Sequence, residues 1–264
     1  MSKVLSLNCA EGGDGPALVM LHGLYGSGNN FRGIARQLEA DHRVLRPDLR
    51  NHGSSPHDAD MDYRAMAADV VALLDSHNIK KASLIGHSMG GKVAMAIALM
   101  HPERVEKLIV VDIAPITYDH SVEHGGIIST LQAVDLTRVS SRDDADAQLE
   151  ERIRQPMVRQ FLLTNLQRQG SAWSWRIPLA TLAEQLPVIQ SWPAALDNAW
   201  DGPTQFIYGG ASDYLSKDGK AAAQRLFPNA TMACIEGAGH WVHAEAPATF
   251  IDRIQHFLAH HHNA

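Results

Sequence analysis

Short apolar runs alternate with amphipathic stretches along the first 116 residues of the chain. The runs favour buried strands, because each is short and ends at a polar or glycine-rich loop. Between Tyr63 and Leu74 the apolar side chains recur at helical spacing, and Asp62 is a suitable N-cap for that helix. The predicted strands are 17–21, 42–45, 82–85 and 108–112, and the other predicted helix is 90–100. This alternation predicts an α/β fold, an open and mostly parallel sheet with helices on both faces.

The alternation stops after Pro115 and returns only at Thr204. The segment between them is rich in charge and tryptophan, has no strand-like alternation, and looks helical over 135–161. We expect its tryptophans to pack its helices against the sheet. From Thr204 onward the pattern predicts a strand at 204–208, a helix at 218–227, a strand at 231–235 and a helix at 246–260. We therefore expect a core formed by residues 1–116 and 201–264, with a helical cap, residues 117–200, inserted between two strands.

The composition agrees with one domain that carries an insertion, and it argues against nucleic-acid partners and membrane spans. The chain has 264 residues, 45% of them hydrophobic and 20% charged, which suits one globular domain with an insertion. A net charge of −6 without a basic stripe argues against a nucleic-acid partner. No apolar run approaches the roughly 18–20 residues of a membrane span, and the N-terminus lacks the apolar core of a secretory signal. With only two cysteines, Cys9 and Cys234, we expect a cytoplasmic protein.

Histidines are frequent, fifteen in all, and four of them lie near the C-terminus. We expect that group, His256, His260, His261 and His262, to belong to a solvated tail and not to a metal site. We expect no metal and no organic cofactor elsewhere in the chain. The sequence makes no prediction of an oligomeric state.

The clearest chemical signal is Gly86-His87-Ser88-Met89-Gly90, which fits the Gly-x-Ser-x-Gly pattern. It lies where a predicted strand ends and a predicted helix begins, and a serine in such a turn has an exposed hydroxyl. The two glycines allow the turn to close without a Cβ clash. The helix that follows presents its first backbone amides to a developing negative charge. Ser88 is therefore the candidate nucleophile.

A serine nucleophile needs a base and an acid that orients the base, and in this architecture they follow it in the order acid, then histidine. His240 lies in a glycine-rich loop after the last predicted strand, and we prefer it as the base to His243, which we expect to be structural. Two aspartates satisfy the order. Asp112 ends the strand after the nucleophile helix, and Asp213 follows the strand 204–208. The residues alone leave both acids open.

Two loops are expected to supply the backbone amides that stabilise a tetrahedral oxyanion. The residue after the nucleophile, Met89, supplies one amide, and Leu24, in the glycine-rich loop after the first predicted strand, supplies the other. His22 and His87 flank the same region, and we expect both to be hydrogen-bonded supports. The segment from Asp48 to Pro56 is expected to form a structured turn beneath the active-site face.

Together these motifs resemble the α/β-hydrolase superfamily over nearly the whole chain outside the insertion. The motifs are His22-Gly23-Leu24, the turn from Asp48 to Ser55, the elbow from Gly86 to Gly91, and Gly239-His240-Trp241 with Glu245-Ala246-Pro247. Val111-Asp112-Ile113-Ala114-Pro115 and Phe206-Ile207-Tyr208-Gly209-Gly210 are most similar to the YbfF-type bacterial esterases and their mitochondrial relatives.

The resemblance implies that the acid lies on the strand after the nucleophile helix, which is Asp112. Many other superfamily members carry the acid in a later loop, after a Pro-Thr pair such as Pro203-Thr204. In this chain that register falls on Ser212, one residue before Asp213. Haloalkane dehalogenases and epoxide hydrolases of this fold have an aspartate at the elbow, where this chain has Ser88.

We therefore expect a serine esterase that cleaves small to medium acyl esters, with thioesters as further substrates, through an acyl-enzyme on Ser88. Carbon–carbon bond hydrolases, lactonases and perhydrolases use the same kind of triad, so they stay open as alternatives. Outside enzymes, the alternative is a ligand-binding protein that retains an inert hydrolase fold.

Overall fold

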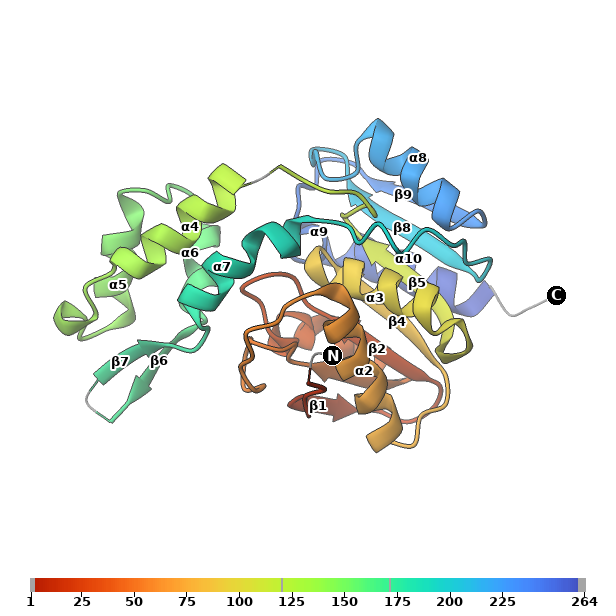
Figure 1. The fold of residues 1–264 in the computed structure, drawn as a ribbon, viewed down its shortest axis with the longest axis horizontal. Coiled ribbons are helices and arrows are strands. Elements are labelled where there is room, and N and C mark those ends of the chain that lie inside the picture. Colours follow the sequence, from red (N-terminus) through yellow and green to blue (C-terminus); the bar gives the residue numbers. More distant parts are fainter. Residues whose placement is uncertain (1–2, 120, 171, 261–264) are drawn as a thin grey trace.

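The computed structural model describes residues 3–119, 121–170 and 172–260 (Figure 1). Its main sheet has the strand order β1-β3-β2-β4-β5-β8-β9, in which β1 is antiparallel to β3 and the other neighbours are parallel. The strands are β1 (Cys9–Gly12), β2 (Ala17–Leu21), β3 (Arg43–Pro47), β4 (Ala82–His87), β5 (Val105–Val111), β8 (Thr204–Gly209) and β9 (Ala230–Ile235). Parallel strands place their carboxyl ends at one edge of the sheet, and the loops that follow them meet there.

Helices cover both faces of this sheet, because the buried strands present apolar side chains on each side. In β2, Leu18 and Met20 pack with α1 (Arg32–Leu38) and α10 (Pro247–His260). Val19 and Leu21 point the other way, into the layer formed by α2 (Tyr63–Ser76), α3 (Met89–Met100) and α8 (Lys217–Leu226). This arrangement confirms the predicted α/β fold with a mostly parallel sheet and helices on both faces.

Between β5 and β8 the chain leaves the sheet and forms a group of helices beside the core, which we call the insertion, residues 117–200 (Figure 1). Its helices are α4 (Ser121–Ala133), α5 (Arg142–Glu150), α6 (Pro156–Leu163) and α7 (Leu179–Gln190), with a short 3-10 turn at Leu136–Arg138. Buried leucines and isoleucines of the insertion are continuous with the core layer that contains α2 and α3.

The structure adds two details to the mostly helical insertion that the sequence predicts. First, it contains strands: β6 (Leu166–Gln169) and β7 (Ala172–Trp175) form an antiparallel hairpin. Each strand is too short to show a clear alternation of apolar and polar residues. Second, the segment 135–161, which the sequence predicts to be helical, is divided into a 3-10 turn, α5 and most of α6, with non-helical residues between them. Ser141 forms a capping box at the start of α5. Pro156 is the first residue of α6, and the first turn is the part of a helix that accepts a proline.

The pattern also does not predict the edge strand β1, because Glu11 and Gly12 read as part of a turn. Of the C-terminal histidines, His256 lies exposed on α10 and His260 ends that helix, whereas His261 and His262 lie outside the described residues. Within the described part of the chain, no helix is long and apolar enough to cross a membrane.

Candidate active site

Ser88 occupies a strained turn between β4 and α3. Its backbone has φ 53° and ψ −120°, a conformation that costs a residue with a side chain about 1–3 kcal/mol. The surrounding structure holds it there: the Ser88 amide donates to the Val111 carbonyl at 3.0 Å, and the Ser88 carbonyl accepts from the Gly91 amide at 2.8 Å. The residues on either side are buried, whereas Ser88 is only half-buried and lines a cavity.

The two glycines of the motif are required by close backbone contacts. A Cβ on Gly86 would lie 2.2 Å from the Gly90 carbonyl oxygen, and a Cβ on Gly90 would lie 2.2 Å from the Leu21 carbonyl oxygen. Strand β4, helix α3 and strand β2 therefore approach one another at the elbow closely enough to admit only hydrogen atoms.

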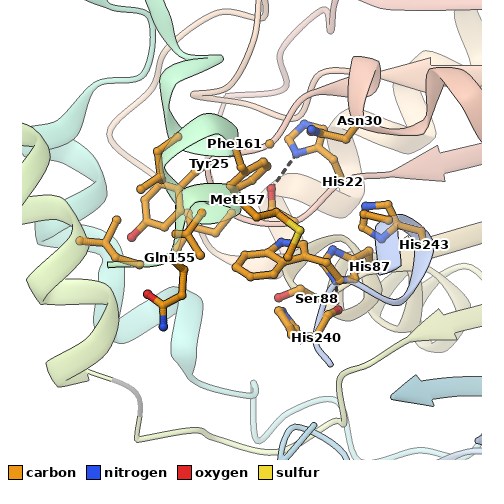
Figure 2. Close-up of a pocket in the computed structure, with 18 of the residues that line it drawn as sticks. His22, Tyr25, Asn30, His87, Ser88, Gln155, Met157, Phe161, His240 and His243 are labelled. Carbon is orange, nitrogen blue, oxygen red and sulfur yellow. Dashed lines mark hydrogen bonds between the residues drawn. The ribbon is translucent and has the colours of Figure 1, made fainter. Parts of the chain in front are cut away.

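His240 lies in the loop after β9 and meets Asp112, which follows β5. The His240 Nδ1 atom is 2.7 Å from the Asp112 Oδ2 atom. Since a carboxylate only accepts hydrogen bonds, Nδ1 is the donor, and in the neutral imidazole Nε2 then carries the lone pair. Figure 2 shows Ser88 and His240 next to each other at the cavity wall.

Asp112 is buried, and donors surround its carboxylate. The Gly209 amide donates to Oδ1 at 3.1 Å, and the Ser212 hydroxyl and His240 Nδ1 both donate to Oδ2. These bonds compensate for the loss of water around a buried charge. Asp213, the other acid that the chain order permits, is exposed. The fold thus brings Asp112, and not Asp213, to His240.

Aromatic rings fix the plane of the His240 imidazole. Tyr214 stacks on it, with ring centroids 3.8 Å apart and an angle of 19° between the planes. His87 lies against it with centroids 4.7 Å apart, and its Nε2 donates to the His240 carbonyl at 2.9 Å. His243 packs against His87 and Phe31.

Burial keeps the two neighbouring imidazoles neutral. It lowers the pKa of His87 well below the usual range and the pKa of His243 to about 4, and in each case nearby histidines add to the effect. His87 therefore supports His240 by ring packing and a hydrogen bond, and His243 packs behind His87. Among the described residues, no group of three or more His, Cys, Asp or Glu side chains is arranged to hold a metal ion.

Neutral histidines also support the loop that carries Leu24. The His22 Nε2 atom accepts from the Leu49 amide at 2.9 Å, and the His52 Nε2 atom accepts from the Tyr25 amide at 3.1 Å. Burial lowers the pKa of His22 and lowers that of His52 to about 3, so both retain the lone pair needed to accept. The turn expected beneath the site is present and holds Leu24 beside the elbow.

The two candidate oxyanion residues flank Ser88. Met89 is the first residue of α3, so its amide has no partner within the helix. Leu24, Ser88 and Met89 together line one small pocket. Two amides on either side of a serine hydroxyl are the arrangement that stabilises an oxyanion during acyl transfer.

A cavity of about 910 Å³ opens above Ser88, and both the core and the insertion line it. Figure 2 shows Met157 and Phe161 of α6 among the side chains that line this cavity, close to Tyr25 of the core. Apolar side chains dominate the wall, among them Ile34, Ile127, Ile153, Val158 and Trp241. The site therefore combines a serine hydroxyl with a large apolar space beside it.

Comparisons with known proteins agree with this geometry. The profile of the family described as alpha/beta hydrolase fold matches residues 16–247. The chain belongs to the α/β-hydrolase family. This confirms the resemblance seen in the sequence motifs.

Several relatives resemble this α/β-hydrolase over most of its length. It is 42% identical to the sn-1-specific diacylglycerol lipase ABHD11 of Mus musculus, over 92% of this chain and 81% of the relative. It is 40% identical to the esterase YbfF of Escherichia coli, over 91% of this chain and 92% of the relative. A solved marine microorganism esterase superimposes with a TM-score of 0.93 at 38% identity, covering 96% of this chain and 99% of that one.

Three residues near the site of this α/β-hydrolase were not anticipated. Ser212 falls at the register where other members carry the acid, yet here its hydroxyl donates to Asp112. Tyr214 provides the stacking surface for His240. Lys92 is buried on the nucleophile helix, where a lysine would be expected to reach solvent. Of the three, only Ser212 stood out in the sequence, by its position relative to Pro203-Thr204. That position did not reveal that its hydroxyl donates to Asp112.

Two glycine substitutions, one at the elbow and one in α4, are expected to have opposite effects on the free energy of unfolding. Gly86→Ala is expected to lower the free energy of unfolding by about 3 kcal/mol or more, because the new methyl group collides with backbone. Gly125→Ala is expected to raise it by about 0.5–1 kcal/mol, because Gly125 lies within α4 and an added Cβ there would meet open space. Denaturant unfolding measures both, and a Gly86→Ala protein with the wild-type midpoint would contradict the contact.

Proposed function

We propose that Ser88 is the nucleophile of this carboxylic ester hydrolase, that His240 is its general base, and that Asp112 orients His240. The observation that carries the proposal is the 2.7 Å contact between His240 Nδ1 and Asp112 Oδ2, in a cavity that Ser88 also lines. A base that is held in one tautomer by a buried carboxylate is what a serine hydroxyl needs in order to attack at neutral pH.

The reaction follows from these positions in two halves. Ser88 Oγ attacks the ester carbonyl carbon while His240 Nε2 takes the serine proton, and the Leu24 and Met89 amides stabilise the oxyanion. His240 then gives the proton to the leaving oxygen, and the acyl group remains on Ser88. Water, deprotonated by His240, releases the acid and regenerates the serine. Loss of one oxyanion donor in such a site costs about 10²–10³ in kcat.

We propose that residues 117–200 act as a cap over the catalytic core, which consists of residues 1–116 and 201–264. Side chains from both parts line the cavity, so the cap contributes part of the surface that contacts substrate. The cavity, at about 910 Å³, is near the upper end of the range for small-molecule sites. This volume suits the small to medium acyl esters and thioesters proposed as substrates, and it leaves room for longer acyl chains. A lipase acting on diacylglycerol and a bacterial esterase among the relatives support this range.

The substrate class is tested with a panel of p-nitrophenyl esters from acetate to decanoate, together with thioesters of the same acyl groups. We expect hydrolysis across the panel and covalent labelling of Ser88 by a fluorophosphonate probe. Labelling without cleavage of any ester or thioester would redirect the assignment to carbon–carbon bond cleavage, lactone hydrolysis or perhydrolysis. A protein that is not labelled at all would be an inert member of the fold.

We also propose a cytoplasmic location for the enzyme. Cys9 and Cys234 are both free thiols, which suits a reducing compartment.

A further inference from the structure

Lys92 is a buried cation one helical turn after Ser88, and no step of the proposed reaction uses it. Its side chain is only 1% exposed, although lysines are almost never fully buried unless they are paired. Burial lowers the pKa of Lys92 to about 7. Such a cost is retained only where the group makes contacts that the fold needs.

The ammonium group of Lys92 holds the end of the last cap helix. Nζ donates to the Gln190 carbonyl at 2.9 Å and to the Ser191 carbonyl at 2.8 Å. The Tyr63 hydroxyl, from α2 of the core, donates to the preceding carbonyl, that of Ile189. The last carbonyls of a helix have no partner within it and carry the negative end of its dipole. Core side chains therefore cap the C-terminus of α7.

The segment that leads into the cap meets Lys92 at the same place. Nζ lies 4.8 Å from the centroid of the Tyr118 ring, within the range of a cation–π contact. The Tyr118 amide donates to the Gln190 carbonyl at 3.0 Å, and the Trp192 amide donates to the Thr117 hydroxyl at 3.1 Å. We call residues 117–118 and 190–192 the neck. Both chain segments of the neck are thus joined to each other and to Lys92.

The position of Lys92 links this neck to the nucleophile. Lys92 lies four positions after Ser88, the N-cap residue of α3, so the two lie on the same face of the helix. Both line the small pocket that Leu24 and Met89 also line. The neck is thus attached to the helix that begins at the nucleophile.

We propose that Lys92 is a positioning residue that fastens the cap to the nucleophile helix and so favours esters with long acyl chains. The proposal rests on the proposed ester hydrolysis. In this proposal a short acyl group stays beside Ser88, whereas a long one extends further into the cavity and reaches the part of its wall formed by Met157 and Phe161 of α6. Binding of the long chain therefore depends more strongly on how the cap is positioned over the core.

The test compares Lys92→Met with the wild type. Methionine retains an unbranched apolar stem but has no donor, so the Ser191 carbonyl loses the Lys92 hydrogen bond and the Gln190 carbonyl keeps the one from the Tyr118 amide. We expect the ratio of kcat/KM for p-nitrophenyl decanoate to that for acetate to fall by about tenfold, mainly through KM, which is a loss of about 1.4 kcal/mol of binding. Hydrogen exchange at the neck amides is expected to become faster.

Lys107→Met is the matched control. Lys107 is also a buried lysine, on β5, and its Nζ donates to a backbone carbonyl, that of Leu258 in α10, outside the cap. We expect it to lower the free energy of unfolding while leaving the ester ratio and the exchange at the neck as in the wild type. Tyr63→Phe, which releases only the Ile189 carbonyl, should move both readouts in the same direction as Lys92→Met.

A Lys92→Met protein with the wild-type ester ratio and wild-type exchange at the neck would overturn the proposal. Equal shifts in Lys107→Met would overturn it as well. If Lys92→Met does not fold, unchanged readouts in Tyr63→Phe would do the same. If the wild type cleaves no ester, the proposed function fails, and the exchange measurement still decides the role of Lys92.

Discussion

Ser88→Ala is expected to lower kcat for p-nitrophenyl butyrate by about 10⁴-fold or more, because it removes the atom that carries the acyl group. The fold should persist, since Ser88 is held by backbone hydrogen bonds to Val111 and Gly91 that alanine also makes. Residual activity above the uncatalysed rate is expected, because the oxyanion amides and the cavity remain. Ester hydrolysis and fluorophosphonate labelling measure the effect.

The control for this variant is Ser76→Ala, a serine exposed at the end of α2 whose hydroxyl donates only to the Leu73 carbonyl. It should retain wild-type kcat and labelling. A Ser88→Ala protein that is still labelled, or that keeps more than a few per cent of the activity, would show that another residue is the nucleophile.

The second large effect separates the two candidate acids. Asp112→Asn is expected to lower kcat by about 10⁴-fold, because an amide in this position no longer holds His240 in the tautomer that leaves Nε2 free. Asp213→Asn should change kcat by less than about twofold, because the Asp213 side chain is exposed and substitutions of exposed side chains usually have small effects. Hydrolysis of p-nitrophenyl butyrate and fluorophosphonate labelling are measured for both variants.

These two variants are matched in chemistry, since each removes one negative charge and adds one amide. Their folded fractions can be compared by circular dichroism before the assay. Loss of turnover in Asp213→Asn together with retained turnover in Asp112→Asn would refute the assignment of Asp112. Equal losses in both would indicate that the loop 209–214 acts as a unit.

The core of the fold was predictable because its signals are local. A parallel strand buried on both faces shows as a short apolar run, as in β2 and β5, and an amphipathic helix such as α2 shows as apolar residues at helical spacing. The cap was less predictable. The β6–β7 hairpin has short strands, and Trp173 and Trp175 lie there against the main apolar core instead of on a helix. Local propensity gives little information on such a segment.

The site was predictable in part, for the same reason. The elbow is a local motif, and the strained φ of Ser88 agrees with the turn that the motif predicts. The choice between Asp112 and Asp213 was not local, because both follow a strand that ends at the same edge of the sheet. Lys92 lies in a helix that the sequence predicts, but nothing in that pattern indicates that its side chain is covered by the cap.

The sequence by itself determined the α/β fold class, the strand–turn–helix elbow at Ser88, and the candidates for base and acid, because each depends on residues close together in the chain. Only the tertiary structure decided which acid contacts His240 and which groups the Lys92 ammonium group contacts. Asp112 and His240 are 128 positions apart, and Lys92 and Gln190 are 98 apart. Contacts at such separations are set by how the sheet orders its strands and how the cap returns to the core, and no local pattern of residues encodes that geometry.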